Sequence, residues 1–147
     1  MKKSAQIHKF LSVVLSAVML LAALPMASFA AAATLTYENL EYTVTNGEVT
    51  ITRYAGTDEA VTVPAEIDGK PVTIIGDGAF TVSKAKNIQL PKSITKIGMM
   101  AFMGSTDAII NLTDLKNLTY IGAYAFVDTW LSGDLVLPEA VTEIGAG

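Results

Sequence analysis

The stretch that decides the fold is ITKIGMMAF, residues 94–102, because close copies of it recur along the chain. The other copies begin at Val72, Leu118 and Val141, and each reads apolar, Thr, a variable residue, Ile and Gly. Their isoleucines are Ile75, Ile97, Ile121 and Ile144, separated by 22, 24 and 23 residues. A period of this length is the signature of stacked repeats, each of which buries its apolar face against its neighbours.

Each repeat also carries a second apolar stretch and, in the first three, an Ala-Phe pair. The second stretch reads VTVP at 61–64, IQLP at 88–91, INL at 110–112 and LVLP at 135–138. Because neighbouring β-strands lie about 4.8 Å apart, equivalent side chains of successive repeats stack. The sequence therefore predicts a β-solenoid with one core column of these isoleucines and another of Phe80, Phe102 and Phe126.

Threonine and glycine hold fixed positions on either side of the variable residue. The threonines predict an outward ladder in which β-branched side chains pair across strands; they are Thr73, Thr95, Thr119 and Thr142. We expect the glycine after each isoleucine to allow a turn that a Cβ would hinder.

A β-hairpin is predicted before the repeats. Residues 42–45 and 48–51 alternate in polarity around Asn46-Gly47, a strong signal for a two-residue turn. In that register Tyr42 faces Ile51 and Val44 faces Val49. Residues 31–60 are thus expected to form an N-terminal hairpin cap over residues 61–147, which hold three full repeats and a truncated fourth.

These motifs resemble the BspA-type leucine-rich repeats of bacterial secreted and surface proteins. The resemblance covers residues 61–147 and implies a mostly β leucine-rich-repeat solenoid with few short helical turns. It also implies a lengthened first loop, at 64–72. Two departures are visible: the turn position that is often Cys holds Ser83, Ser105 and Thr129, and the third repeat lacks the proline and has two extra residues within 113–117.

The first 30 residues have the features of a secretory signal peptide. Three lysines precede the apolar stretch Phe10–Leu24, Pro25 follows it, and residues 28–30 are suited to cleavage. We expect the mature chain to begin at Ala31 or Ala33 and to be secreted or held at the cell surface. The alternative is an uncleaved anchor, against which stand the short apolar core and the proline.

Composition excludes several classes of function for residues 31–147. This part has no Cys or His, seven basic and fourteen acidic side chains, and a formal charge of −7. Thiol nucleophiles, Ser-His-Asp triads and Cys/His zinc sites are impossible, and a single arginine, Arg53, argues against nucleic acid. The carboxylates of Asp58-Glu59 and Glu66-Asp68 lie in turn-rich segments, where solvated loop charges are usual. We expect no catalytic residue, metal or cofactor.

The variable position of the repeat is the best candidate for binding. It holds Ile74, Lys96, Tyr120 and Glu143, and such variation within a fixed frame indicates an outward face. We predict Lys96, Tyr120 and Glu143 as binding residues. Trp130 has two interpretations, packing within the turn 127–131 or contact with a partner.

The leading hypothesis is an exported, non-enzymatic binding module for a protein or a glycan. The alternative is a structural stalk or N-terminal segment of a longer surface protein, and no residue constellation favours an enzyme. The last repeat stops at Gly147, before its Ala-Phe pair. We therefore expect a fragment of a longer array with an exposed apolar end at Leu135, Leu137, Val141 and Ile144.

Overall fold

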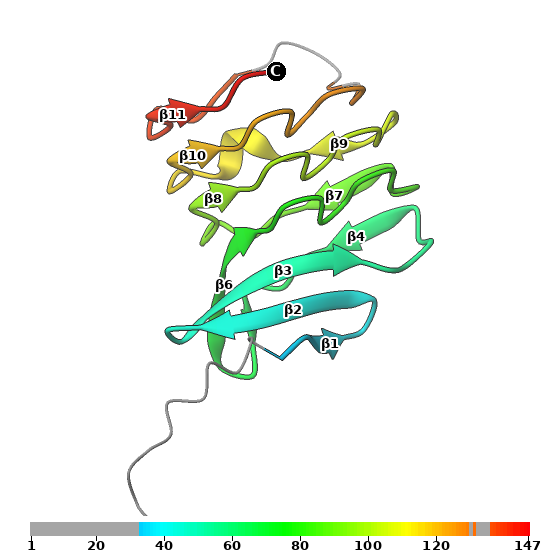
Figure 1. Cartoon of the computed structure of the whole chain (residues 1–147), viewed down its shortest axis with the longest axis vertical. Coiled ribbons are helices and arrows are strands. Elements are labelled where there is room, and N and C mark those ends of the chain that lie inside the picture. The colour runs from blue at the N-terminus through cyan, green and yellow to red at the C-terminus, as the bar shows by residue number, and fades with distance from the viewer. Residues whose placement is uncertain (1–32, 130, 132–135) are drawn as a thin grey trace, which may run out of the picture. The chain divides into compact units, whose positions relative to one another are not determined.

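The computed structural model describes residues 33–129, 131 and 136–147, which form β-coils stacked along one axis (Figure 1). The longer sheet has the order β1 (Leu35–Tyr37), β2 (Leu40–Thr45), β3 (Glu48–Tyr54), β6 (Lys70–Ile75), β8 (Lys96–Ile97), β10 (Tyr120–Ile121) and β11 (Glu143–Ile144), and β5 (Glu66–Ile67) pairs with β6. The shorter sheet contains β4 (Ala60–Thr62), β7 (Asn87–Gln89) and β9 (Ile109–Ile110). Strands β3, β6, β8, β10 and β11 are parallel, as are β4, β7 and β9. The predicted solenoid is confirmed.

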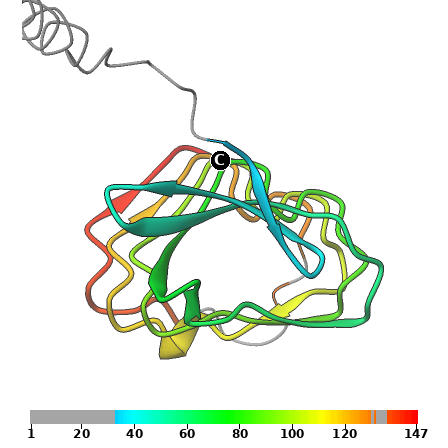
Figure 2. The same ribbon diagram turned by 90° about the horizontal axis from the view of Figure 1, so that it is seen from below.

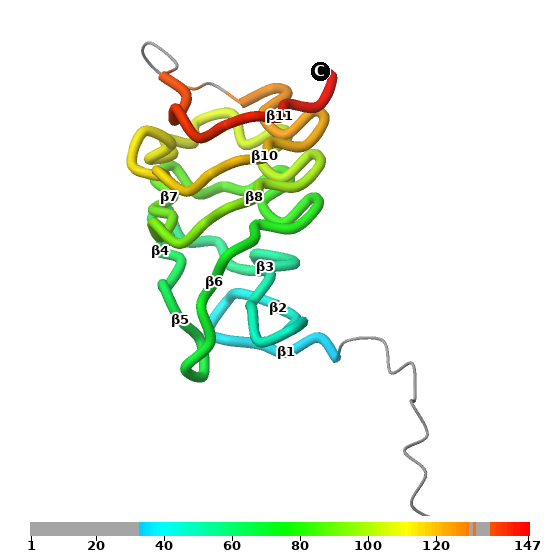
Figure 3. Tube along the Cα trace, turned by 90° about the vertical axis from the view of Figure 1, so that its left-hand side faces the viewer, coloured from blue at the N-terminus to red at the C-terminus, as the bar shows by residue number. Residues whose placement is uncertain are grey.

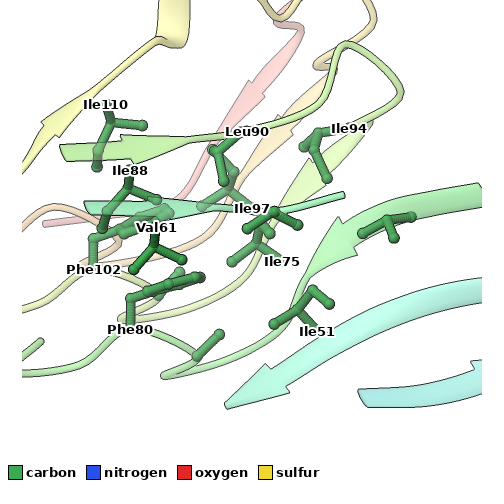
Figure 4. Close-up of a cluster of buried hydrophobic side chains, with 14 of the residues drawn as sticks. Ile51, Val61, Ile75, Phe80, Ile88, Leu90, Ile94, Ile97, Phe102 and Ile110 are labelled. Atoms are coloured by element: carbon green, nitrogen blue, oxygen red, sulfur yellow. The ribbon is translucent and has the colours of Figure 1, made fainter. Parts of the chain in front are cut away.

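Viewed along the axis, successive coils lie over one another, with the two sheets on different sides (Figure 2). Figure 3 shows β6, β8, β10 and β11 one above another in chain order. Ile51, Ile75, Ile97 and Ile121 are in register across the long sheet, and each is at most 4% exposed. In Figure 4, Ile51, Ile75 and Ile97 form a column beside Phe80 and Phe102.

The phenylalanine column is a continuous aromatic stack. Ring centroids lie 5.3 Å apart between Phe80 and Phe102 and 5.5 Å apart between Phe102 and Phe126. Tyr54 extends the stack by one ring, with its centroid 5.5 Å from that of Phe80. Offset stacking at these distances adds to the stabilisation from burial.

The hairpin has the predicted register and a larger role than that of a cap. Tyr42 pairs with Ile51 and Val44 with Val49 around Asn46-Gly47. Its second strand, β3, then pairs in parallel with β6, so that the hairpin contributes a coil of its own. The long first loop forms a second hairpin, β5–β6, whose turn residues Asp68 and Gly69 have φ of 51° and 69°.

The threonine ladder is held by hydroxyl-to-backbone bonds rather than by side-chain pairs. Thr95 donates both its backbone N–H (2.8 Å) and its Oγ1 (3.2 Å) to the carbonyl of Thr73. Thr119 and Thr142 repeat this arrangement on the next two coils. Thr73 differs from the prediction because it is buried, and its Oγ1 donates to Glu48. Each hydroxyl thus ties its coil to the preceding one.

The repeat glycines are needed for a reason other than the predicted turn. None of Gly76, Gly98, Gly122 and Gly145 has a positive φ. Instead, a Cβ on Gly76 would lie 2.9 Å from the carbonyl oxygen of Ile51, and one on Gly98 would lie 2.6 Å from the backbone nitrogen of Asp77. The glycine column is therefore where neighbouring coils approach most closely.

The departures in the third repeat are absorbed locally. Its extra residues form a 3-10 helix, η1 (Leu112–Asp114), followed by the fully buried Leu115. Asn111 occupies the position of Gln89 in the preceding repeat, and its amide bonds both the N–H and the carbonyl of Leu90, at 2.8 and 3.0 Å. At the turn, Ser105 Oγ donates to the carbonyl of Phe80 and Thr129 Oγ1 to that of Phe102.

The last coil is less covered than the others. Ile144 is 57% exposed, Val136 is 58% exposed, and Leu137 and Val141 are half-buried. Leu135 and Trp130, for which the sequence makes predictions, lie outside the described residues, as does the apolar stretch Phe10–Leu24. Within the part of the chain that the structure describes, no helix is both long and apolar enough to cross a membrane.

Candidate interaction surface on the long sheet

The predicted binding residues lie side by side on consecutive strands. Lys96 on β8 pairs in register with Tyr120 on β10, and Tyr120 with Glu143 on β11. Ile74 on β6 continues the row, and Thr50 on β3 ends it. We call these five residues the outer row. Thr50 was not predicted as a member because the hairpin strand lacks a residue of the repeat motif.

The outer row is accessible and rests on a rigid frame. Lys96 and Glu143 are exposed, whereas Thr50, Ile74 and Tyr120 are half-buried. The isoleucines that follow Thr50, Ile74, Lys96 and Tyr120 are buried in the core column, whereas Ile144 after Glu143 is exposed. The coils are joined by bonds such as Gly98 N–H to the carbonyl of Ile75 (2.7 Å). Because the backbone is already fixed, it loses little conformational freedom when a partner binds.

Charge and aromatic surface alternate along the outer row. Tyr120 lies between the ammonium of Lys96 and the carboxylate of Glu143, which belong to strands two steps apart, or about 9.6 Å. A tyrosine offers apolar area and a hydrogen-bonding hydroxyl to a partner. The opposite charges on either side of it can fix the orientation in which a partner with complementary charges binds. This arrangement can recognise a surface with complementary charges, and it contains no nucleophile next to a base.

Three of the four carboxylates considered for catalysis, Asp58, Glu59 and Asp68, are engaged in structural contacts. Asp58 accepts hydrogen bonds from Asn39 and Tyr54, and Asp68 accepts one from the Tyr42 hydroxyl at 2.9 Å, which raises the pKa of Tyr42. Glu59 pairs with Lys86 at 2.6 Å, and the hydrogen bond and charge of Lys86 lower the pKa of Glu59. Across the described ranges, no three acidic, His or Cys side chains are grouped to hold a metal ion.

Residues 111–113 and 117–119 match the glycosylation sequon Asn-x-Ser/Thr, and both asparagines make structural contacts. The Asn111 amide accepts one hydrogen bond from Leu90 and donates one to it, and Asn117 Nδ2 donates to the carbonyl of Lys92 at 2.9 Å. Thr119, the third residue of the second sequon, belongs to the threonine ladder. These contacts account for the two asparagines without a modification.

Solved structures share this architecture. A leucine-rich repeat protein from T. pallidum is 29% identical with a TM-score of 0.64, and the match covers 77% of this chain and 64% of that one. A leucine-rich cell surface protein from Faecalibacterium prausnitzii A2-165 is 27% identical with a TM-score of 0.67, covering 78% of this chain and 33% of the other. This chain thus spans under two thirds of the length of either protein.

A leucine-rich repeat protein from Bacteroides capillosus, 23% identical with a TM-score of 0.57, shares the fold over 78% of this chain and 99% of its own. No curated protein matches. A family model for the BspA type leucine-rich repeat region matches residues 60–147 in six copies. Together with the coils and columns described above, this match shows that the chain belongs to the BspA-type leucine-rich repeat family.

Proposed function

We propose that this chain is a protein-interaction module of the bacterial surface that contacts its partner through the outer row. The observation that carries the proposal is the register of Lys96, Tyr120 and Glu143 on three adjacent strands. The frame around them repeats, while these side chains differ in charge and size. Variation at an exposed position within a repeated frame is expected where a surface is adapted to a partner. Membership in a family of bacterial surface repeats supports the same function.

Replacing Lys96, Tyr120 and Glu143 together by alanine is expected to weaken partner binding about 10- to 100-fold, since a few central side chains dominate interface energies. Arrays of host matrix proteins and of cell-wall glycans supply the candidate partners, and binding is measured by surface plasmon resonance. The matched control replaces Asn87 and Gln89, exposed on the shorter sheet, by alanine. Equal binding by the two variants would contradict the proposal, and binding to neither array would favour a structural spacer.

Export is the second part of the proposal. The lysines, apolar stretch and small residues of positions 1–30 support it. In a secreting bacterium, N-terminal sequencing of the processed chain is expected to begin at Ala31 or Ala33. Recovery of Met1 on membrane-bound protein would replace cleavage by anchoring.

A further inference from the structure

A second group of exposed apolar side chains lies on the turns that follow the long sheet. Val82 is 70% exposed, Met99 44% and Tyr124 47%, while Met100 and Met103 are half-buried. We call these five residues the turn patch. They belong to three successive repeats, and none of them is part of the outer row.

Backbone contacts bring the turn patch together. The N–H of Val82 donates to the carbonyl of Met103 at 2.8 Å, and the N–H of Met100 to that of Ala123, the neighbour of Tyr124, at 2.9 Å. Thr81, adjacent to Val82, donates its Oγ1 to the carbonyl of Met100 at 2.9 Å. The three turns therefore form one continuous surface.

The turn patch keeps side chains where the backbone favours glycine. Val82, Met100 and Tyr124 have φ of 54°, 54° and 57°, in the left-handed region. Equivalent positions in other repeats hold Gly104 and Gly78, which adopt this conformation without a Cβ penalty. A β-branched residue such as Val82 is an outlier there.

Val82 is 70% exposed and Tyr124 47% exposed, so burial within the fold compensates only in part for the unfavourable backbone. Residues held in this way concentrate at binding sites, where the exposed side chain serves an external contact. Methionine, which adapts its shape to different surfaces, is common at such contacts.

The charges around the turn patch indicate the chemistry of the partner. The outward positions of the three turns (77–78, 81–82, 99–100, 103–104, 123–124 and 127–128) contain Asp77 and Asp128 and no Lys or Arg. Of the two lysines that follow Val82, Lys86 is neutralised by Glu59. The other, Lys84, is exposed beside Val82 and Asp107, so that three carboxylates (Asp77, Asp107 and Asp128) outnumber one free ammonium around the turn patch. We infer that the turn patch binds a protein segment that presents apolar side chains flanked by Lys or Arg.

The test uses a random 12-residue peptide display library selected on the purified chain. Enriched peptides are expected to combine apolar residues with Lys or Arg. The variant V82G/M100G/Y124G should bind the synthesised peptides at least tenfold more weakly, while its melting temperature stays equal or rises because the backbone penalty is relieved. A purely structural role for these side chains predicts the opposite change in melting temperature.

A second variant, D77N/D128N, removes the two charges with little change of shape and should also weaken binding. The alanine variant of Lys96, Tyr120 and Glu143 should bind the peptides unchanged, which separates this inference from the proposed function. The inference is wrong if no peptide is enriched, if enriched peptides are acidic, or if the glycine variant binds normally or melts earlier. Binding to zwitterionic lipid vesicles without peptide binding would likewise overturn it.

Discussion

Replacing Phe102 by alanine is expected to lower the free energy of unfolding by about 3–5 kcal/mol, the range for a fully buried aromatic side chain. Phe102 is 0% exposed and stacks on Phe80 and Phe126 with nearly parallel rings. Its removal opens a cavity in the middle of the column and breaks two ring contacts at once. Urea denaturation followed by circular dichroism measures the loss.

Gln89 provides the matched control for this substitution. It is exposed on β7, and its side-chain amide donates a hydrogen bond to Oδ1 of Asn87, a surface neighbour, at 2.9 Å. Gln89→Ala should change the free energy of unfolding by less than about 0.5 kcal/mol. Comparable losses in the two variants would show that the inward and outward assignments are wrong.

Gly98→Ala is expected to destabilise the fold by about 3 kcal/mol or more, at the upper end of overpacking effects. The added methyl would lie 2.6 Å from the nitrogen of Asp77 and 2.7 Å from the carbonyl carbon of Gly76. Both are backbone atoms of the preceding coil, so relief requires the coils to separate. Thermal unfolding of the variant and the parent chain measures the effect.

Gly69→Ala distinguishes collision from backbone strain. Gly69 has φ of 69°, but a Cβ there would meet no atom within 4 Å. Alanine at this position should lower stability by about 1–2 kcal/mol through the left-handed backbone alone. A loss at Gly98 no larger than that at Gly69 would exclude close approach as the reason for the glycine column.

The features that repeat were predictable from the sequence. Regular spacing of Ile75, Ile97 and Ile121 requires each to occupy the same place in its coil, and stacking then follows from strand geometry. The hairpin register was predictable because Asn46-Gly47 determines which residues face each other. Both inferences depend on local pattern, which sequence displays directly.

The coil made by β3 could not be recognised from the repeat motif because its sequence is shorter than the motif. Val49-Thr50-Ile51 is one residue shorter than the motif at 72–75, and the register shift places Thr50 at the variable position and leaves Thr73 without a partner. Tyr54 follows Ile51 by three positions, whereas Phe80 follows Ile75 by five. A search for a constant motif passes over such a coil, although Tyr54 continues the aromatic stack.

The outer row was predictable and the turn patch was not, for a physical reason. Strand pairing makes the variable residues neighbours once the repeat is aligned, so Lys96 and Tyr120 could be placed together. The turn patch depends on the sign of φ at Val82 and Met100, which side-chain identity does not reveal. The available signal was the substitution of valine for the glycine found at position 104 of the next repeat.

The direction of the bonds between coils determines how the chain responds to tension. The Thr95 and Gly98 N–H groups donate to carbonyls of the preceding coil, and bonds between neighbouring strands run in the direction in which the coils are stacked. A pull between the two ends of the stack therefore loads these bonds in series and peels the end coils first. Each coil of 22 to 24 residues would release roughly 70–85 Å of extended chain. A partner held on the remaining coils would stay attached while the tether lengthens, because each outer-row side chain is supported by its own coil and the adjacent ones.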